Sequence, residues 1–517
     1  MPVWTKEQND AIYKSGTNII VSAGAGSGKT AVLSERVLEK LKQRIHINEL
    51  LILTFTKAAA SEMKERIRKK IKKENLNQEL DMIDAAYITT FDSFALSIVK
   101  KYHYLINVSK DVNIIEESLI KIKKEEFLDE IFEDKYQNDA NFKELINDFC
   151  VKDDKEIRNQ ILNINDKLDM LIDKIDYLEN YQFSDIDKDI NSYLIYIKRQ
   201  ILSLEDIISE LSNYTDSEYL NKLYESINPL LNSNTYDEIK INSNLKLPPL
   251  PRGSQEETKK IKDKLNKKIK SINELCSYEN IDNIKDTILK TKDYIKVIIE
   301  VILNLTKKIN YYKYQNDMYE FNDIALLAIK IVKENPDIAL ELKNSFKEIM
   351  IDEYQDTNDL QEEFIRYISS NNVYMVGDIK QSIYRFRNAN PNIFKNKYDN
   401  YSKEIGGIKI DLNKNFRSRK EVLDDINLIF NLIMNDDIGG ADYLKTHQMV
   451  FGNNAYFNEG ATKQDYDLEI LEYENSNNNF SKDEVECFLI ANDIKNKINS
   501  NYQVFDKDEL VLRRARY

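Results

Sequence analysis

The sequence predicts an α/β fold in which a mainly parallel, doubly wound sheet is interrupted by a large helical insertion. Short apolar runs alternate with helical stretches on both sides of the chain's middle, and the first run leads into a glycine-rich turn. The middle itself is poor in glycine and has apolar residues at three- and four-residue intervals, which is the helix period. Ligands of such sheets bind beyond the carboxyl ends of the strands, so the residues after each run are the candidate site.

The first expected element is a strand over residues 19–21, followed by a phosphate-binding loop and a helix that runs from Lys29 to Leu41. In the GxxxxGK[ST] pattern, backbone N–H groups close on phosphates, the lysine reaches the β- and γ-phosphates, and the hydroxyl holds Mg²⁺. The candidate cofactor-binding residues are Ala23, Gly24, Ala25, Gly26, Ser27, Gly28, Lys29 and Thr30, with Ala23 in place of the first glycine. A plain glycine turn would not require Lys29-Thr30.

Five further strands are expected in the runs 50–55, 87–90, 348–351, 373–376 and 408–412. Between about residues 116 and 316 the helical pattern is broken only at Leu247–Gly253, a proline-rich stretch that cannot be helix interior. This region therefore predicts a helical domain inserted into the α/β fold.

Polar residues follow three of these runs. Asp352 and Glu353 form a carboxylate pair after the run 348–351, where a nucleotide hydrolase needs one group for the Mg²⁺ shared with Thr30 and one to polarise water. Residues 377–387 combine an amide, two arginines and two aromatics, which could sense a γ-phosphate or stack on bases. Residues 413–419 read NKNFRSR, and an arginine near a γ-phosphate stabilises its transferring charge.

Composition limits the class of protein. A length of 517 residues predicts about three domains, and no run approaches the ~20 apolar residues of a membrane helix. The N-terminus has charges where a signal peptide needs an apolar stretch, and three widely spaced cysteines form neither a metal motif nor a disulfide framework. We therefore expect a cytoplasmic protein with no membrane partner.

The net charge of −14 argues against binding of nucleic acid by bulk attraction, so any polyanion site must be local. The basic run from Lys64 to Lys73 could be such a site or a solvated helix face, and the sequence leaves both open.

Taken in order, the segments AGAGSGKT, LTFTKAAASEM, ITTFDSF, IDEYQDT, VGDIKQSIYRFR and LNKNFRS resemble superfamily 1 DNA helicases of the UvrD/Rep/RecB group. Within that group, WTKEQNDAI, AGAGSGKTAVL and QSIYRFRNANP most resemble the N-terminal part of AddA, which belongs to the ATP-dependent helicase/nuclease of bacterial double-strand break repair. The resemblance spans residues 4–419.

The resemblance implies ATP and Mg²⁺ as cofactors and a role for each matching residue. Gln8 would read the adenine edge, and Phe416 would lie near the adenine ring. Asp352 and Thr30 would hold the metal ion. The implied catalytic residues are Glu353 as the base, Gln381 as the link between γ-phosphate and DNA, and Arg417 as an arginine finger.

Single-stranded DNA would be the track of such a motor, with double-stranded DNA as the substrate of unwinding. The DNA-binding residues implied by the family are Thr54, Phe55, Thr56, Thr89, Phe91, Ser93, Phe386 and Arg387. Phe55 and Phe386 are the base-stacking candidates, although Phe55 could also be a core side chain at a strand end.

The implied architecture is a RecA-like motor domain in two parts, residues 1–115 and 321–405, around a helical insertion at 116–320. Residues 406–517 would be the incomplete start of a second RecA-like domain. From this we expect an N-terminal fragment of a 3′ to 5′ helicase that binds ATP but hydrolyses it weakly, and whose partner is a second, AddB-like subunit.

One alternative is a catalytically inactive, nucleotide-regulated DNA-binding fragment. An unrelated phosphate-loop kinase would not need Gln381, Arg417 or the DNA segments.

Overall fold

The computed structural model describes residues 4–435, 438, 440–453, 466–473, 480–506 and 511–514. The chain divides into two compact units, one made of Met1–Ile114 with Asp317–Tyr517 and the other of Ile115–Asn316. Part of the region predicted to begin a second motor domain, 406–517, lies outside the described residues.

The first unit contains a six-stranded parallel sheet, which confirms the α/β prediction and all six expected strands. The strand order is β3-β2-β6-β7-β1-β8. The strands are β1 (Ile19–Ala23), β2 (Leu50–Thr54), β3 (Tyr87–Thr90), β6 (Glu348–Ile351), β7 (Val373–Gly377) and β8 (Ile408–Leu412). Strand β8 lies past position 405, the predicted end of the first motor domain, and pairs along its length with β1.

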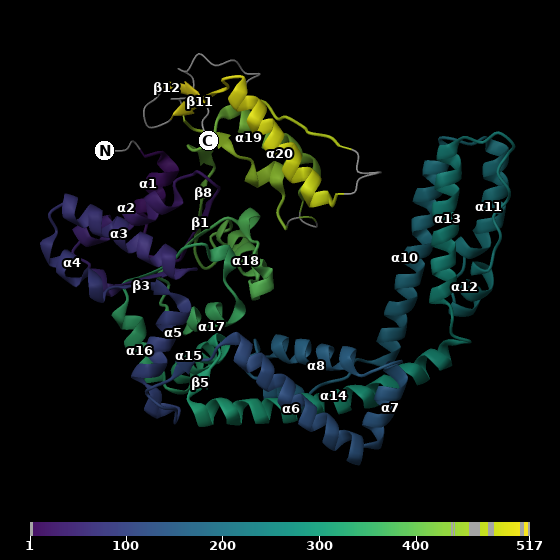
Figure 1. The fold of residues 1–517 in the computed structure, drawn as a ribbon, viewed down its shortest axis with the longest axis horizontal. Coiled ribbons are helices and arrows are strands. Elements are labelled where there is room, and N and C mark those ends of the chain that lie inside the picture. The colour runs from purple at the N-terminus through teal and green to yellow at the C-terminus, as the bar shows by residue number, and fades with distance from the viewer. Residues whose placement is uncertain are drawn as a thin grey trace. The chain divides into compact units, whose positions relative to one another are not determined.

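Four of these strands, β1, β2, β6 and β7, are buried at every residue, because helices cover a parallel sheet on both faces. Helices α1 (Lys6–Tyr13), α2 (Lys29–Lys42) and α3 (Lys57–Lys73) share one apolar core with the sheet. Helices α5 (Phe91–Lys101), α15 (Phe321–Glu334) and α17 (Asp359–Ile368) pack together on the opposite side of the strands (Figure 1).

A buried ion pair joins helix α2 to strand β6. Arg36, which has no exposed surface, donates to both carboxylate oxygens of Glu348 at 2.9 and 2.5 Å. It also donates to the carbonyls of Ala11 and Ile12 in α1, and its guanidinium lies 4.2 Å from the centre of the Tyr374 ring. One side chain therefore connects α1, the helix that follows the loop, and the strand that ends in the carboxylate pair.

The other elements of this unit are shorter or lie at its margins. The helices are α4 (Asn77–Met82), α16 (Pro336–Ser345), α18 (Pro391–Tyr401), α19 (Lys420–Ile433) and α20 (Lys482–Asn499). The strands are β4 (Asn113–Ile114), β5 (Met318–Tyr319), β9 (Lys414–Asn415), β10 (Val450–Phe451), β11 (Gln503–Asp506) and β12 (Val511–Arg514). Single helical turns are η1 (Ile47–Glu49), η2 (Ile83–Ala85), η3 (His103–Leu105), η4 (Tyr354–Asp356), η5 (Ile379–Gln381), η6 (Arg385–Arg387) and η7 (Tyr443–His447).

The second unit is the expected helical insertion. Its helices are α6 (Glu117–Asn138), α7 (Ala140–Phe149), α8 (Lys155–Leu168), α9 (Lys174–Glu179), α10 (Ile186–Ser212), α11 (Ser217–Leu231), α12 (Tyr236–Ser243), α13 (Glu256–Leu275) and α14 (Ile281–Asn316). Helices α10 to α13 lie side by side and share their own apolar core with the start of α14 (Figure 1). The proline-rich stretch falls between α12 and α13, as predicted.

The strands β4 and β5, next to the two ends of this insertion, pair with each other. Asn113 lies opposite Met318 and Ile114 opposite Tyr319, and the Asn113 N–H donates to the Asp317 carbonyl at 2.9 Å. The chain thus leaves and re-enters the first unit at neighbouring points.

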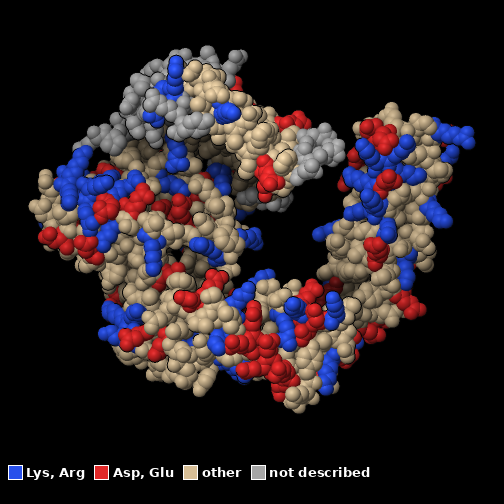
Figure 2. All heavy atoms as spheres, viewed as in Figure 1, with Lys and Arg blue, Asp and Glu red and all other residues tan. Residues whose placement is uncertain are grey.

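Basic and acidic side chains are interspersed on the face shown in Figure 2. On α3, Arg66 pairs with Glu62 at 2.9 Å, and Lys64 and Arg68 both pair with Asp84, at 3.1 and 2.5 Å. These contacts support the solvated-face interpretation of the basic run. None of the helices in the described part of the chain combines the length and apolar character needed to span a bilayer.

Candidate nucleotide and nucleic-acid site

The predicted phosphate-binding loop lies at the carboxyl end of β1, the strand between β7 and the edge strand β8. Ala23 is the last residue of β1, and Gly28 immediately precedes α2 with φ of +88°. Gly26 also has a positive φ, +72°, and the Ser27 N–H donates to the Gly24 carbonyl at 3.2 Å. Residues other than glycine rarely adopt these left-handed angles, so the two glycines are what allow the loop to turn into the helix.

Lys29 brings together residues that follow three different strands. Its ammonium Nζ lies 3.0 Å from Glu353 Oε2, after β6, and 3.4 Å from Gln381 Oε1, after β7. The Lys29 side chain is only 12% exposed. The sequence separately nominated these three residues, and the fold places their functional groups in direct contact.

One amide side chain, that of Gln355, and one carboxylate, that of Asp378, hold Glu353 and Gln381 in place. Gln355 donates to Glu353 Oε2 at 2.9 Å, and its own oxygen accepts from the Asp378 N–H at 2.9 Å. Asp378 in turn accepts from Gln381 Nε2 at 2.8 Å. Sequence reasoning missed Gln355 and Asp378, although both follow the carboxyl ends of strands and the same rule could have found them.

Glu353 has a left-handed backbone with φ of +50°, which is uncommon for a residue with a side chain. Such conformations persist only where the surroundings hold them, and they concentrate at functional sites. Here the Glu353 carboxylate is held by Lys29 and Gln355.

The carboxylates of this site repel one another in a partly dry environment. Burial raises the pKa of Asp352 from 3.8 to about 6, the charge of Glu353 adds to the rise, and Lys29 opposes it. Burial and the charge of Glu353 likewise raise the pKa of Asp356 to about 6. The raised pKa values of Asp352 and Asp356 show that negative charge is concentrated around Glu353 and that Lys29 offsets it only in part.

Thr30 and Asp352 line the same pocket, which has a volume of about 600 Å³ and also contains Glu353, Gln381 and Tyr384. Hydroxyl and carboxylate oxygens suit Mg²⁺, which keeps few protein ligands and shares the rest with phosphates and water. The negative charge around Asp352 fits a divalent cation. In the described part of the chain, no group of three or more His, Cys, Asp or Glu side chains could hold a metal ion.

Gln8 lies beneath the loop and is almost fully buried. Its Nε2 donates to the Ser27 carbonyl at 3.0 Å, and its Oε1 accepts from the Thr5 N–H at 3.0 Å within the cap of α1. An amide has two N–H hydrogens and two oxygen lone pairs, so these contacts use half of them. The predicted adenine contact would have to use the remaining half.

The segment that carries Phe416 and Arg417 lies directly against the loop. The Phe416 N–H donates to the Gly26 carbonyl at 2.9 Å, and Asn415 Nδ2 donates to the Ala25 carbonyl at 2.8 Å. A Cβ atom on Gly26 would lie 2.7 Å from the Cβ of Arg417. The sequence nominated Phe416 and Arg417 for this site but missed Asn415, whose contacts with the loop depend on the tertiary fold.

Three aromatic rings and one arginine form a cluster beside this pocket. The Phe55 and Tyr384 ring centres are 4.6 Å apart, and those of Tyr384 and Phe386 are 5.7 Å apart. The Arg387 guanidinium lies 5.6 to 5.9 Å from all three ring centres. Phe386 is 76% exposed, so this cluster offers π-faces and a cation to solvent. The sequence analysis did not nominate Tyr384 by number.

The remaining polar DNA-binding candidates lie at strand ends and helix starts, and one of them, Thr56, caps a helix. Thr56 precedes α3 and accepts from the Ala59 N–H, while the Thr54 hydroxyl donates to the Thr56 carbonyl. The Ser93 N–H and hydroxyl both bond Thr90, which precedes α5, and Thr89 lies in β3.

Phe91 is placed differently from its expected role. Its ring is buried and packs edge-to-face on Phe364, with centres 5.6 Å apart. A contact between this ring and a base would require that packing to open.

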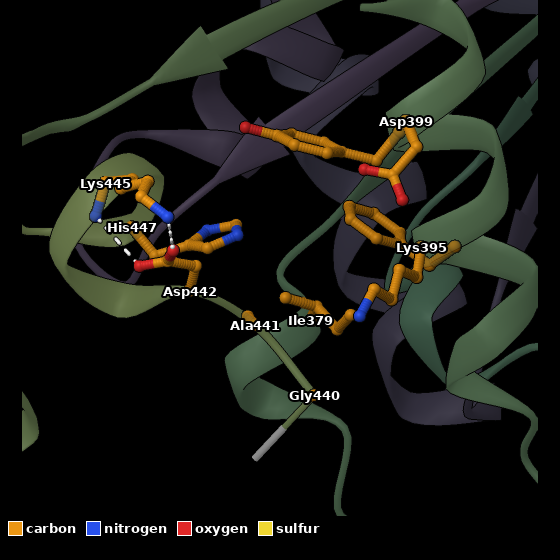
Figure 3. Close-up of a pocket in the computed structure, with 10 residues that line it drawn as sticks. Ile379, Lys395, Asp399, Gly440, Ala441, Asp442, Lys445 and His447 are labelled. Carbon is orange, nitrogen blue, oxygen red and sulfur yellow. Dashed lines mark hydrogen bonds and ion pairs between the residues drawn. The ribbon is translucent and has the colours of Figure 1, made fainter. Parts of the chain in front are cut away.

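A second hollow of about 360 Å³ lies between η5, α18 and residues 440–447 (Figure 3). Asp442 pairs with Lys445 at 2.6 Å on one side, and Asp399 and Lys395 lie on the other. Burial, with a smaller effect of Lys380, lowers the pKa of His447 to about 4, so its imidazole is neutral near pH 7. None of the individually named candidate residues lines this hollow, although Ile379 belongs to the candidate segment 377–387.

Comparison with known proteins agrees with the geometry. The chain is 31% identical to the A subunit of the ATP-dependent helicase/nuclease of Clostridium kluyveri (strain ATCC 8527) over 575 aligned positions, which cover 98% of this chain and 46% of the relative. It is 33% identical to the protein of that name from Clostridioides difficile (strain 630), over 88% of this chain and 40% of the relative. For the Listeria welshimeri protein the values are 33%, 98% and 46%. The chain thus spans about half the length of these relatives or less.

Residues 4–402 match the family of the UvrD/REP helicase N-terminal domain. That match covers the loop, the carboxylate pair and Gln381, which the fold brings together around Lys29. The chain therefore belongs to the UvrD/REP helicase family.

Proposed function

We propose that this chain is the ATP-binding motor part of a 3′ to 5′ DNA helicase of the AddA type, acting in double-strand break repair and recombination. The observation that carries the proposal is the meeting of Lys29, Glu353 and Gln381 at the carboxyl ends of β1, β6 and β7. A phosphate-binding lysine, a carboxylate suited to polarise water and an amide suited to sense the γ-phosphate lie within contact distance.

In this proposal, the loop from Ala23 to Gly28 binds the phosphates and Lys29 moves from Glu353 to the β- and γ-phosphate oxygens. Glu353 is then free to orient the attacking water and accept its proton. Thr30 and Asp352 would hold Mg²⁺, which neutralises charge on the phosphate oxygens when it is bound.

Two further residues would act at the γ-phosphate. Arg417, whose Cβ lies near Gly26, would stabilise the charge on the transferring phosphoryl group. Gln381, which contacts both Lys29 and Asp378, would report on the presence of that group.

Single-stranded DNA would run along the aromatic cluster of Phe55, Tyr384 and Phe386. Base–aromatic stacking is independent of sequence and contributes about 1–3 kcal/mol per base, which suits a motor that moves along any strand. Because the chain carries a net charge of −14, a DNA site on it needs local positive charge, and Arg387 among these rings would supply it. Thr54, Thr56, Thr89 and Ser93 would contribute polar contacts nearby.

From the motif resemblance and the composition, we also propose that the protein acts on double-stranded DNA, works with a second, AddB-like subunit, and is cytoplasmic. We also retain the proposed division into a motor domain at 1–115 and 321–405, an insertion at 116–320 and a second motor domain beginning near 406.

A titration with a fluorescent ATP analogue tests the nucleotide site. Lys29→Ala should abolish binding, because it removes the cation that contacts the β- and γ-phosphates. Lys14→Ala is the matched control, since this lysine follows α1, is half exposed and pairs only with Asp10 among the described residues. Affinity that survives Lys29→Ala would contradict the assignment.

ATPase activity measured with and without a single-stranded oligonucleotide separates the motor from a nucleotide-regulated DNA-binding protein. Turnover that the oligonucleotide stimulates, and that Glu353→Gln removes while nucleotide binding remains, supports the motor. Oligonucleotide binding that depends on ATP, without turnover, supports the alternative.

A further inference from the structure

We infer that Asn415 is a positioning residue, which ties the turn carrying Arg417 to the phosphate-binding loop and so holds Arg417 at the γ-phosphate end of the site. This inference rests on the proposed function. It adds a residue that neither the motif pattern nor the family match assigns a role.

The Asn415 side chain is buried, and its amide bonds in two directions. Its Nδ2 donates to the carbonyl of Ala25 at 2.8 Å. Its Oδ1 accepts from the N–H groups of Arg417 and Ser418, both at 2.8 Å. An oxygen that accepts from the residues two and three positions later fixes a tight turn, and here the turn bears Arg417.

The main chain reinforces the same connection. The Phe416 N–H donates to the Gly26 carbonyl, so two successive loop carbonyls, those of Ala25 and Gly26, bond to this segment. A Cβ on Gly26 would lie 2.8 Å from Asn415 Oδ1 as well as 2.7 Å from the Arg417 Cβ. The turn can approach this closely only because the loop has a glycine at that position.

Strand β10 supports the turn from its other side. The Gly452 N–H donates to the Asn415 carbonyl at 2.9 Å, and Val450 and Phe451 pair with Lys414 and Asn415. A Cβ on Gly452 would lie 2.9 Å from the Phe416 ring. The backbone of Asn415 is therefore held by β10, while its side chain bonds to the phosphate-binding loop.

The consequence is specific to the γ-phosphate. ADP needs the loop and Lys29 but has no γ-phosphate for Arg417 to contact. An Asn415 substitution that only misplaces Arg417 should therefore weaken binding of a non-hydrolysable ATP analogue and leave ADP binding unchanged. A substitution that damages the loop itself would weaken both.

The experiment is a titration of the full chain with the fluorescent ATP analogue and with ADP, in the presence of Mg²⁺. Asn415→Ala should lower affinity for the ATP analogue about 10-fold or more, the size expected for a charge-assisted hydrogen bond, with ADP affinity unchanged. Asn415→Asp keeps the oxygen that accepts from Arg417 and Ser418 but loses the donor to Ala25, and should behave like Asn415→Ala. Asn413→Ala, at an exposed position two residues earlier, is the control and should change neither affinity.

Arg417→Ala should reproduce the loss, and the double variant Asn415→Ala/Arg417→Ala should lose no more than either single variant, because both act through one contact. Equal weakening of ADP and the ATP analogue would overturn the inference and assign Asn415 to loop stability. Wild-type affinity in Asn415→Asp would also overturn it, since the bond to Ala25 would then be dispensable. A wild-type chain that binds neither nucleotide would overturn the proposed function and this inference together.

Discussion

Replacing Asp352 by Asn should stabilise the ligand-free protein at neutral and alkaline pH. The Asp352 carboxylate is buried beside Glu353, and these two effects raise its pKa from 3.8 to about 6. A folded-state pKa above the unfolded value means that the folded state binds the proton more tightly. The stability that the protonated group provides is complete below the unfolded pKa and is lost as the pH rises through about 6.

The magnitude follows from linkage between protonation and folding. One pKa unit corresponds to about 1.4 kcal/mol, so ionised Asp352 costs at most about 3 kcal/mol of unfolding free energy at pH 8 and about half of that at pH 5. Asparagine is nearly isosteric, carries no charge and keeps the oxygen that accepts from the Glu353 N–H. The variant should gain this energy at pH 8 and less at pH 5.

The single tryptophan makes the measurement local. Trp4 packs against the core around the sheet, so its fluorescence during urea unfolding reports on the unit that contains the site. Asp111→Asn, at an exposed position, is the control and should change little at either pH. The reasoning fails if Asp352→Asn is no more stable than wild type at pH 8, or if the gain is as large at pH 5.

Three other outcomes are expected. Arg36→Met should lower the unfolding free energy by about 3–5 kcal/mol in the same assay, because it leaves Glu348 buried without its main partner. Adding Glu348→Met to that variant should restore part of the loss. An unchanged unfolding midpoint in Arg36→Met would contradict this reasoning. Phe55→Ala and Tyr384→Ala should each weaken binding of a labelled oligonucleotide by about 1–3 kcal/mol in fluorescence anisotropy, and unchanged affinity would place those rings in the core only. Because burial lowers the pKa of His447 to about 4, wild type should lose stability as the pH falls from 6.5 toward 4, and His447→Gln should lose less over that interval.

The sheet and the three strand-end motifs could be predicted because each depends on a local pattern. Buried parallel strands are short apolar runs, and site residues follow their carboxyl ends. The rule therefore placed Lys29, Glu353 and Gln381 at one edge although Lys29 and Glu353 are 324 positions apart. The helical insertion was equally visible from its period and its lack of glycine.

What could not be predicted depends on contacts across the fold. The bond from Asn415 to Ala25 joins residues 390 positions apart, and no local pattern selects an asparagine for that contact. The cap formed by Gln8 and Thr5 was local, but the bond from Gln8 to Ser27 was not. For Phe91, the helical spacing of two phenylalanines could have predicted a core position. Phe91 and Phe94 stand one helical turn apart and face the same core, with Phe364 packed on both rings.

The pairing of β4 with β5 has a consequence for the length of the chain between them. The chain leaves and re-enters the first unit at neighbouring, hydrogen-bonded positions. Residues 115–316 can therefore be treated as one loop whose two ends are held together. The entropy of closing a flexible loop grows only with the logarithm of its length, about 0.6 kcal/mol for each doubling. The insertion also builds a core of its own, so the stability of the sheet depends little on the insertion's size. Evolution could lengthen, shorten or exchange this segment while the residues around Lys29 keep their geometry.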